Sequence, residues 1–199
     1  SSTGNQTYTG AITLGGDSAL LANGTNAVIA TSGAINSDGT TRSLTFNVSG
    51  ANSTLVFNEA IGNTAAIGSL NATASNITLN GSQVKTTGSQ TFAGAITLTK
   101  DTLLQSTGNN ATVALANTVD GDTAGTRSLT ISANGSGSTV TLGDAVGATN
   151  RLSAFDITGT TISFNGPTVN TTGNQSYAGA LTLGANTTLS ASNLKTVSG

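Results

Sequence analysis

Apolar and polar residues alternate along the chain in short stretches of three to six residues. Ile12 and Leu14 flank a threonine, and the same spacing recurs at 44–46, 55–57 and 77–79. An alternation with period two puts every second side chain on one face of an extended strand, so each stretch predicts a β-strand with one buried side. No window carries a convincing helical stripe of apolar residues. The stretches are separated every few residues by Gly, Asn, Ser or Asp. These residue types are typical of turns, so turns are predicted between the strands.

The alternation belongs to a longer repeat. The segment TGNQTYTGAITLG at 3–15 returns as TGSQTFAGAITLT at 87–99 and as TGNQSYAGALTLG at 172–184. The chain therefore divides into unit 1 (3–86), unit 2 (87–171) and the start of unit 3 (172–199). Unit 2 is longer than unit 1 by a single residue, which faces the stretch between Ser32 and Thr41.

Positions that stay apolar in both units are predicted to form one continuous core. They are Ile12, Leu14, Leu44, Phe46, Leu55, Phe57, Ile77 and Leu79 in unit 1, and Ile96, Leu98, Leu129, Ile131, Val140, Leu142, Ile162 and Phe164 in unit 2.

Two all-β architectures fit this pattern. One is a parallel β-helix (β-solenoid) with about 20 residues per coil and about four coils per unit. The other is a tandem array of β-sandwich domains. The solenoid is favoured because the strands are short, the chain holds only 2 Tyr and 5 Phe, and no linker separates the units. In a solenoid of four coils per unit, Tyr8, Phe92 and Tyr177 would stack at equivalent places.

Composition narrows the function. The chain has no Cys, His, Met or Trp, and carries 8 acidic and 6 basic residues. So few positive charges cannot form a nucleic-acid groove, and no apolar run is long enough for a membrane-spanning helix. The absence of His and Cys excludes the common catalytic triads and ordinary zinc sites, and the acids are scattered, so no enzyme activity is expected. A cysteine-free chain suits export across membranes.

Three charged positions recur between the units. They are Asp17 with Asp101, Arg42 with Arg127, and Glu59 with Asp144. A repeated binding spot is one interpretation. The favoured interpretation is that the acids cap turns and that the arginine forms a surface ion pair, for example Arg42 with Asp38.

Two further candidate sites come from short motifs. In VDGDTAG at 119–125, Asp120 and Asp122 have the spacing of calcium-binding loops, although such loops need more oxygen ligands. No other cofactor is predicted. Asn-x-Ser/Thr sequons are frequent, and the glycosylation candidates are Asn5, Asn23, Asn52, Asn71, Asn110 and Asn174.

The phrases TTGxQxYxGAxTLG and TRSLT, within this repeat composition, resemble the repeats of filamentous-haemagglutinin-like bacterial exoproteins. These are large adhesins of the two-partner secretion or autotransporter type. The resemblance covers essentially the whole chain, but no binding motif of that family can be matched to these positions. It implies a right-handed parallel β-helix that is exported and holds a cell to a surface, to matrix or to another cell.

The sequence therefore predicts a structural rod segment of a secreted, cell-surface adhesin fibre, anchored through parts of a longer parent chain. Expected partners are surface or matrix polysaccharide, or other fibres of the same protein, and not nucleic acid or a membrane. A polysaccharide-binding or polysaccharide-cleaving β-helix protein and an ice-binding solenoid are the alternatives.

Overall fold

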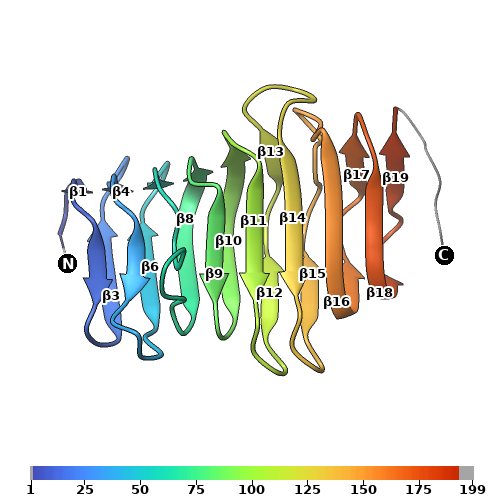
Figure 1. Ribbon diagram of the computed structural model, residues 1–199. Helices are drawn as coiled ribbons and strands as arrows, with labels where there is room; N and C mark the ends of the chain where they lie inside the picture. Colours follow the sequence, from blue (N-terminus) through green and yellow to red (C-terminus); the bar gives the residue numbers. More distant parts are fainter. Residues whose placement is uncertain (1, 193–199) are drawn as a thin grey trace.

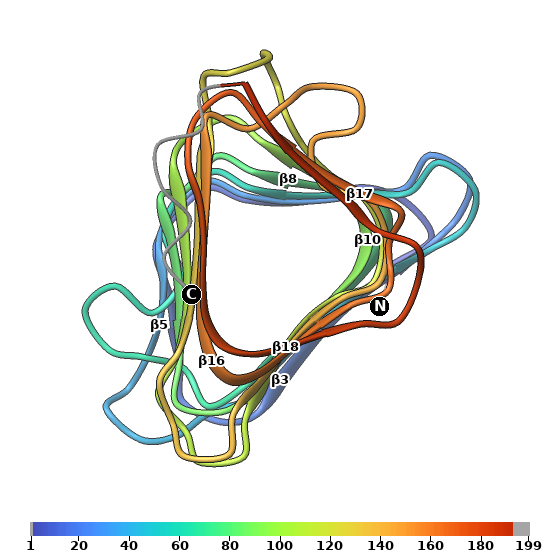
Figure 2. The same cartoon turned by 90° about the vertical axis from the view of Figure 1, so that its right-hand side faces the viewer.

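Short strands stack coil upon coil along one axis in the computed structural model, which describes residues 2–192 (Figure 1). The fold is a parallel β-solenoid of about eight coils with about 23 residues per coil, and residues 2–192 form no helix. Viewed from the C-terminal end, the chain runs counterclockwise as it approaches the viewer, so the solenoid is right-handed (Figure 2). No helix among residues 2–192 has the length and apolarity needed to cross a membrane.

Each coil has three faces, A, B and C, which the chain visits in that order. Face A holds β1 (Gln6–Tyr8), β4 (Val28–Thr31), β7 (Thr54–Phe57), β13 (Val119–Gly121), β17 (Thr168–Thr171) and β19 (Thr188–Ala191). Face B holds β2 (Ile12–Leu14), β5 (Ile35–Ser37), β9 (Gln83–Thr86), β11 (Thr102–Ser106) and β14 (Ser128–Ala133). Face C holds β3 (Ser18–Asn23), β6 (Leu44–Ser49), β12 (Thr112–Leu115) and β15 (Thr139–Leu142).

Four longer strands bend round a corner and serve two faces. They are β8 (Leu70–Leu79) and β10 (Gln90–Leu98), which run from face C to face A, and β16 (Ala154–Phe164) and β18 (Gln175–Leu183), which run from face B to face C. The bend in β10 falls at Gly94, where a Cβ atom would collide with the carbonyl oxygen of Ala74 in the preceding coil. A residue with a side chain could not occupy this position without a shift of the backbone, whereas β8, which contains no glycine, turns its corner at Ala74 and Ser75.

The interior is one apolar column shared by both units. Buried side chains form a single cluster from Leu14 to Val169, with no interruption near residue 86. The apolar positions that recur between the units all belong to this cluster. Only Ile12 among them is partly buried. Parallel pairing in register stacks like upon like, so Ile77 lies between Leu55 and Ile96 on face A.

The coil is longer than the sequence suggests, and its length varies. One coil runs from Ile77 to the paired Ile96, whereas a clearly longer one runs from Val119 to the paired Val146. Ile12–Leu14 lies on face B of the first coil, but its counterpart Ile96–Leu98 lies on face A of the fifth. One unit therefore spans eleven faces, or three and two-thirds coils, rather than four.

The expectation that Tyr8, Phe92 and Tyr177 stack above one another is wrong for this reason. Tyr8 pairs with Thr31 on face A, Phe92 with Leu115 on face C, and Tyr177 with Ile157 on face B. Because eleven faces are not a whole number of three-faced coils, equivalent residues fall on different sides of the rod.

Candidate functional site

The recurring arginine, Arg42 or Arg127, lies on one of two hydrogen-bonded neighbouring loops in each unit. In unit 1 these loops are 37–43 and 62–66. The backbone N–H of Ser37 donates to the carbonyl oxygen of Ala65 (3.2 Å), and its hydroxyl donates to that of Ala66 (2.9 Å). The N–H of Gly68 donates to the carbonyl oxygen of Arg42 (2.6 Å). We call this pair of loops the loop ridge of unit 1.

An ion pair closes the first loop of the ridge. The Arg42 guanidinium donates to both oxygens of the Asp38 carboxylate, at 3.1 and 2.8 Å. The carboxylate also accepts the backbone N–H of Thr40 (3.0 Å). Hydrogen bonding from Arg42, helped by Thr40, lowers the pKa of Asp38 from 3.8 to about 2. The favoured interpretation, a surface ion pair, holds here.

Unit 2 has the same ridge, built from 122–127 and 147–151. The Arg127 guanidinium donates to the Asp122 carboxylate at 2.7 and 3.0 Å, and this hydrogen bonding lowers the pKa of Asp122. The ion pair spans five positions in unit 2 and four in unit 1. The extra residue of unit 2 therefore lies inside this loop.

Asp17 and Asp101 tie successive coils together. Oδ1 of Asp17 accepts the backbone N–H of Ser43, and Oδ1 of Asp101 accepts that of Ser128, both at 2.8 Å. Each serine directly follows the arginine of a ridge, and the charge of each aspartate helps raise the pKa of that arginine, after its hydrogen-bonded partner. Oδ1 of Asp144 accepts the backbone N–H of its neighbour Ala145 (2.7 Å). Asp17, Asp101 and Asp144 thus all accept backbone N–H groups.

The two calcium candidates have other partners. Oδ1 of Asp120 accepts the backbone N–H groups of Thr149 and Asn150 at 2.9 and 3.0 Å, and Asp122 is held by Arg127. Asn36 replaces Asp120 in unit 1, and its amide oxygen accepts two equivalent N–H groups at 3.0 and 3.2 Å. A neutral amide does the same work, so this position does not depend on charge. Among residues 2–192, no group of three His, Cys, Asp or Glu could hold a metal ion.

The six glycosylation candidates, Asn5, Asn23, Asn52, Asn71, Asn110 and Asn174, are all exposed. Asn52 and Asn110 occupy turns with φ of 57° and 54°, a left-handed conformation that asparagine tolerates better than most residues. Oδ1 of Asn5 accepts the backbone N–H of Val28 (2.9 Å). Turn geometry accounts for Asn52 and Asn110, and a coil-to-coil hydrogen bond accounts for Asn5. Attachment of a glycan stays a prediction for all six.

A glutamine just past a corner of the coil is a recurring polar group that the sequence analysis missed. Nε2 of Gln175 donates to the carbonyl oxygens of Val169 (3.2 Å) and Ser190 (2.8 Å), and to Oγ1 of Thr171 (3.1 Å). Nε2 of Gln90, the copy in unit 2, donates to the equivalent groups: the carbonyl oxygens of Val84 and Gln105 and Oγ1 of Thr86. Its retention in all three copies, within GNQTY, GSQTF and GNQSY, was the available signal.

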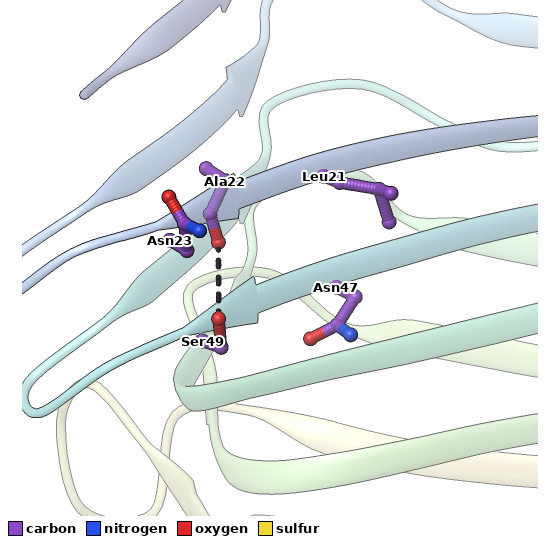
Figure 3. Close-up of a pocket in the computed structure, with 5 residues that line it drawn as sticks. All are labelled: Leu21, Ala22, Asn23, Asn47 and Ser49. Atoms are coloured by element: carbon purple, nitrogen blue, oxygen red, sulfur yellow. Dashed lines mark hydrogen bonds between the residues drawn. The ribbon is translucent and has the colours of Figure 1, made fainter. Parts of the chain in front are cut away.

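A shallow hollow lies on the outer side of face C near the N-terminal end (Figure 3). Its volume is about 200 Å³, and it is lined by Leu21, Ala22, Asn23, Asn47 and Ser49. Gln105 and Ser132 stand in unit 2 where unit 1 has Leu21 and Asn47. The lining chemistry is not repeated, so the hollow is no part of the repeating architecture.

Comparison with known proteins found no matching family model, no matching curated protein and no matching solved structure.

Proposed function

We propose that this chain is a structural rod segment of a secreted, cell-surface bacterial fibre that mediates attachment, aggregation or contact with a biofilm matrix. The observation that carries the proposal is the uninterrupted stack of about eight coils over one core. A coil contacts only its neighbours, so such a stack can be lengthened by copying without redesign. At about 4.8 Å per coil, eight coils give a rod of roughly 38 Å.

The polar groups that recur between units support a mechanical role. The carboxylates of Asp17 and Asp101 and the amides of Gln90 and Gln175 are all engaged in bonds between or within coils. These groups hold each coil on the next. A catalytic site would instead need acids or bases that face a substrate together.

The adhesin part of the proposal comes from the resemblance to filamentous-haemagglutinin-like exoproteins. The solenoid agrees with the fold that this resemblance implies. Export, anchoring by parts of a longer chain, and contact with matrix polysaccharide or with other fibres are proposed on that basis. Many weak contacts along a rod add up to a useful avidity.

The ice-binding alternative finds less support. Ice recognition needs a flat rank of matching side chains on one face. Here the outward Thr78 on face A has its unit 2 counterpart, Ser163, on face C. The repeat therefore moves matching side chains to another side of the rod.

An antibody against the exposed loop 147–151 tests the proposal. Immunogold labelling of intact, unpermeabilised cells of the source organism should decorate material outside the outer surface. In a strain with an in-frame deletion of unit 2, antibodies against the neighbouring coils should still label the cell surface. Adherence should fall, because the rod is shorter. Labelling that appears only after permeabilisation would contradict the surface location, and unchanged adherence in a strain lacking the whole gene would contradict the role in attachment.

A further inference from the structure

Successive copies of the repeat are rotated about the rod axis by one face. The strand GAITL of unit 1 lies on face B (Ile12–Leu14), that of unit 2 on face A (Ile96–Leu98), and its counterpart GALTL in unit 3 on face C (Leu181–Leu183). Eleven faces separate each copy from the next, one face short of four full coils. Three copies therefore visit all three sides once.

The loop ridges follow the same rotation. In unit 1 the loop 62–66 interrupts face B, because Ile61 and Ile67 on either side of it pair with Val84 and Thr86. In unit 2 the loop 147–151 interrupts face A, between Val146 and Leu152, which pair with β17. Figure 2 shows the two ridges on different sides of the triangle: that of unit 1 projects at the left, in blue and teal, and that of unit 2 projects at the top, in yellow and orange.

The rotation is tolerated because each copy meets equivalent neighbours whichever face it occupies. Phe92 pairs with Ala72 in the preceding coil, and its counterpart Tyr177 pairs with Ile157. Residue 157 is itself the unit 2 counterpart of residue 72. The contacts of a copy are therefore set by the equivalent residues of the copy before it, and they do not depend on the side of the rod on which the copy lies.

We infer that the repeat generates a threefold screw of loop ridges around the rod. Successive ridges lie about 18 Å apart along the axis, and a ridge returns to the same edge after three copies, or eleven coils, at about 53 Å. The inference goes beyond the proposed function and holds whether or not the rod serves adhesion. In a longer array the ridges would thus face all three sides of the rod in turn, and no single side would carry them all.

Distance measurements between spin labels test the screw. Two extra copies of 87–171 are inserted after Thr171, and Thr64→Cys is paired with Thr149→Cys in the first, second or third copy of unit 2. Both threonines are exposed in equivalent ridge loops. A control pair in the unmodified chain, Thr64→Cys with Thr158→Cys, keeps to face B over four coils and should give about 19 Å plus the label linkers.

The distance between the labels of the first pair should be clearly longer than that of the control, because the first pair crosses the rod from one side to another. Its separation along the axis alone is slightly smaller than that of the control. A face of five or six residues is about 17–20 Å wide, so we expect about 25 Å or more. The third pair should return to the purely axial distance of about 53 Å. A first pair no longer than the control would overturn the inference, as would a third pair well above that axial distance. A lengthened chain that loses its β circular-dichroism signal would also overturn it, since the screw needs interchangeable copies.

Discussion

The hydroxyl of Tyr177 donates a 2.7 Å hydrogen bond to Oε1 of Gln175, whose Nε2 already bridges two coils. Tyr8 and Gln6 make the same 2.7 Å bond in unit 1. Burial, with a smaller effect of Asp156, raises the pKa of Tyr177 well above its usual range, so its phenol stays a donor. In unit 2 the aromatic residue is Phe92, and Oε1 of the fully buried Gln90 has no hydrogen-bond partner within residues 2–192.

Restoring that donor should stabilise the protein. In Phe92→Tyr the new hydroxyl would lie where those of Tyr8 and Tyr177 lie and would bind Oε1 of Gln90. A satisfied buried acceptor is worth about 1 kcal/mol, so we expect the free energy of unfolding in urea to rise by about that amount.

A double-mutant cycle checks the cause. Gln90→Met keeps the side-chain length and removes the acceptor, so Phe92→Tyr in that background should give no gain. A loss of stability in the single Phe92→Tyr variant would instead mean that the added oxygen overfills the core.

Thr31 offers a second test of buried polar groups. Its side chain is 1% exposed, and its Oγ1 has no hydrogen-bond partner in the described part of the chain. Thr31→Val keeps the shape of the side chain and removes the hydroxyl that lacks a partner. We therefore expect the free energy of unfolding to rise by about 1 kcal/mol and the thermal midpoint to rise with it.

Thr86→Val is the matched control, because Oγ1 of Thr86 donates to the carbonyl oxygen of Gly88 (2.6 Å) and accepts Nε2 of Gln90 (3.2 Å). That variant should unfold at a lower temperature. Equal effects of the two substitutions would show that hydrogen bonding does not separate these sites.

Leu129→Asp should damage the rod locally. Leu129 is buried on face B between Thr102 and Phe155, and burial of an unpaired carboxylate should cost about 4 kcal/mol or more. Amide hydrogen exchange should accelerate in β11, β14 and β16 before it does in β1 to β4, because distant coils do not touch.

Ser132→Asp, on the outward side of the same strand, should leave the exchange pattern nearly unchanged. Uniform loss of protection along the chain in Leu129→Asp would contradict nearest-neighbour coupling.

The Asp38–Arg42 pair should make acid stability depend on Arg42. The folded-state pKa of Asp38 is depressed, so its contribution is present above about pH 3.8 and is lost as the pH falls toward about 2. In Arg42→Gln the pKa of Asp38 should rise toward 3.8, and stability should fall less steeply between pH 4 and 2. NMR titration of the Asp38 carboxyl measures this shift, and a pKa that remains near 2 would assign it to the Thr40 N–H instead.

The sequence predicted strands well because alternation reports directly on which side chains are buried. Leu55 and Phe57, for example, are both fully buried on face A. The length of a coil could not be predicted in the same way, because it depends on the corners. Gly94 turns one corner with no loop, whereas 147–151 adds a loop within a face. The unit 3–86 divides easily into four equal coils, and only the pairing register shows eleven faces.

The candidate site was predicted in part. The recurrence of Arg42 and Arg127 indicated an ion pair, and Asp38 was correctly suggested as a partner. Asp122 was placed in a calcium motif instead, since the extra residue of unit 2 hides its equivalence to Asp38. The corner glutamines were overlooked because an uncharged amide amid Thr, Ser and Asn does not stand out until its three hydrogen bonds are seen.

Deletion of unit 2, residues 87–171, tests whether the copies are interchangeable. The new junction joins Thr86 to Thr172 and reads VKTTGNQSYAG in place of VKTTGSQTFAG. Gln175 would then donate to the carbonyl oxygen of Val84 and to Oγ1 of Thr86, which Gln90 now binds, and would keep its bond to Ser190. Tyr177 would stack on Ala72, as Phe92 now does. The chain should stay folded and lose three and two-thirds coils, about 18 Å of rod length by small-angle X-ray scattering.

The control for that experiment is deletion of 97–171, which joins Ile96 to Thr172 inside β10 and brings together segments that are not equivalent. Its junction omits the rest of a face, so the following coils meet the wrong neighbours, and we expect loss of cooperative unfolding. If both deletion variants fold, or neither does, the eleven-face unit is not the unit of exchange. If only the variant lacking 87–171 folds, the stacking of one copy on the next sets the length of the repeat, and the rod can be lengthened or shortened only by whole copies.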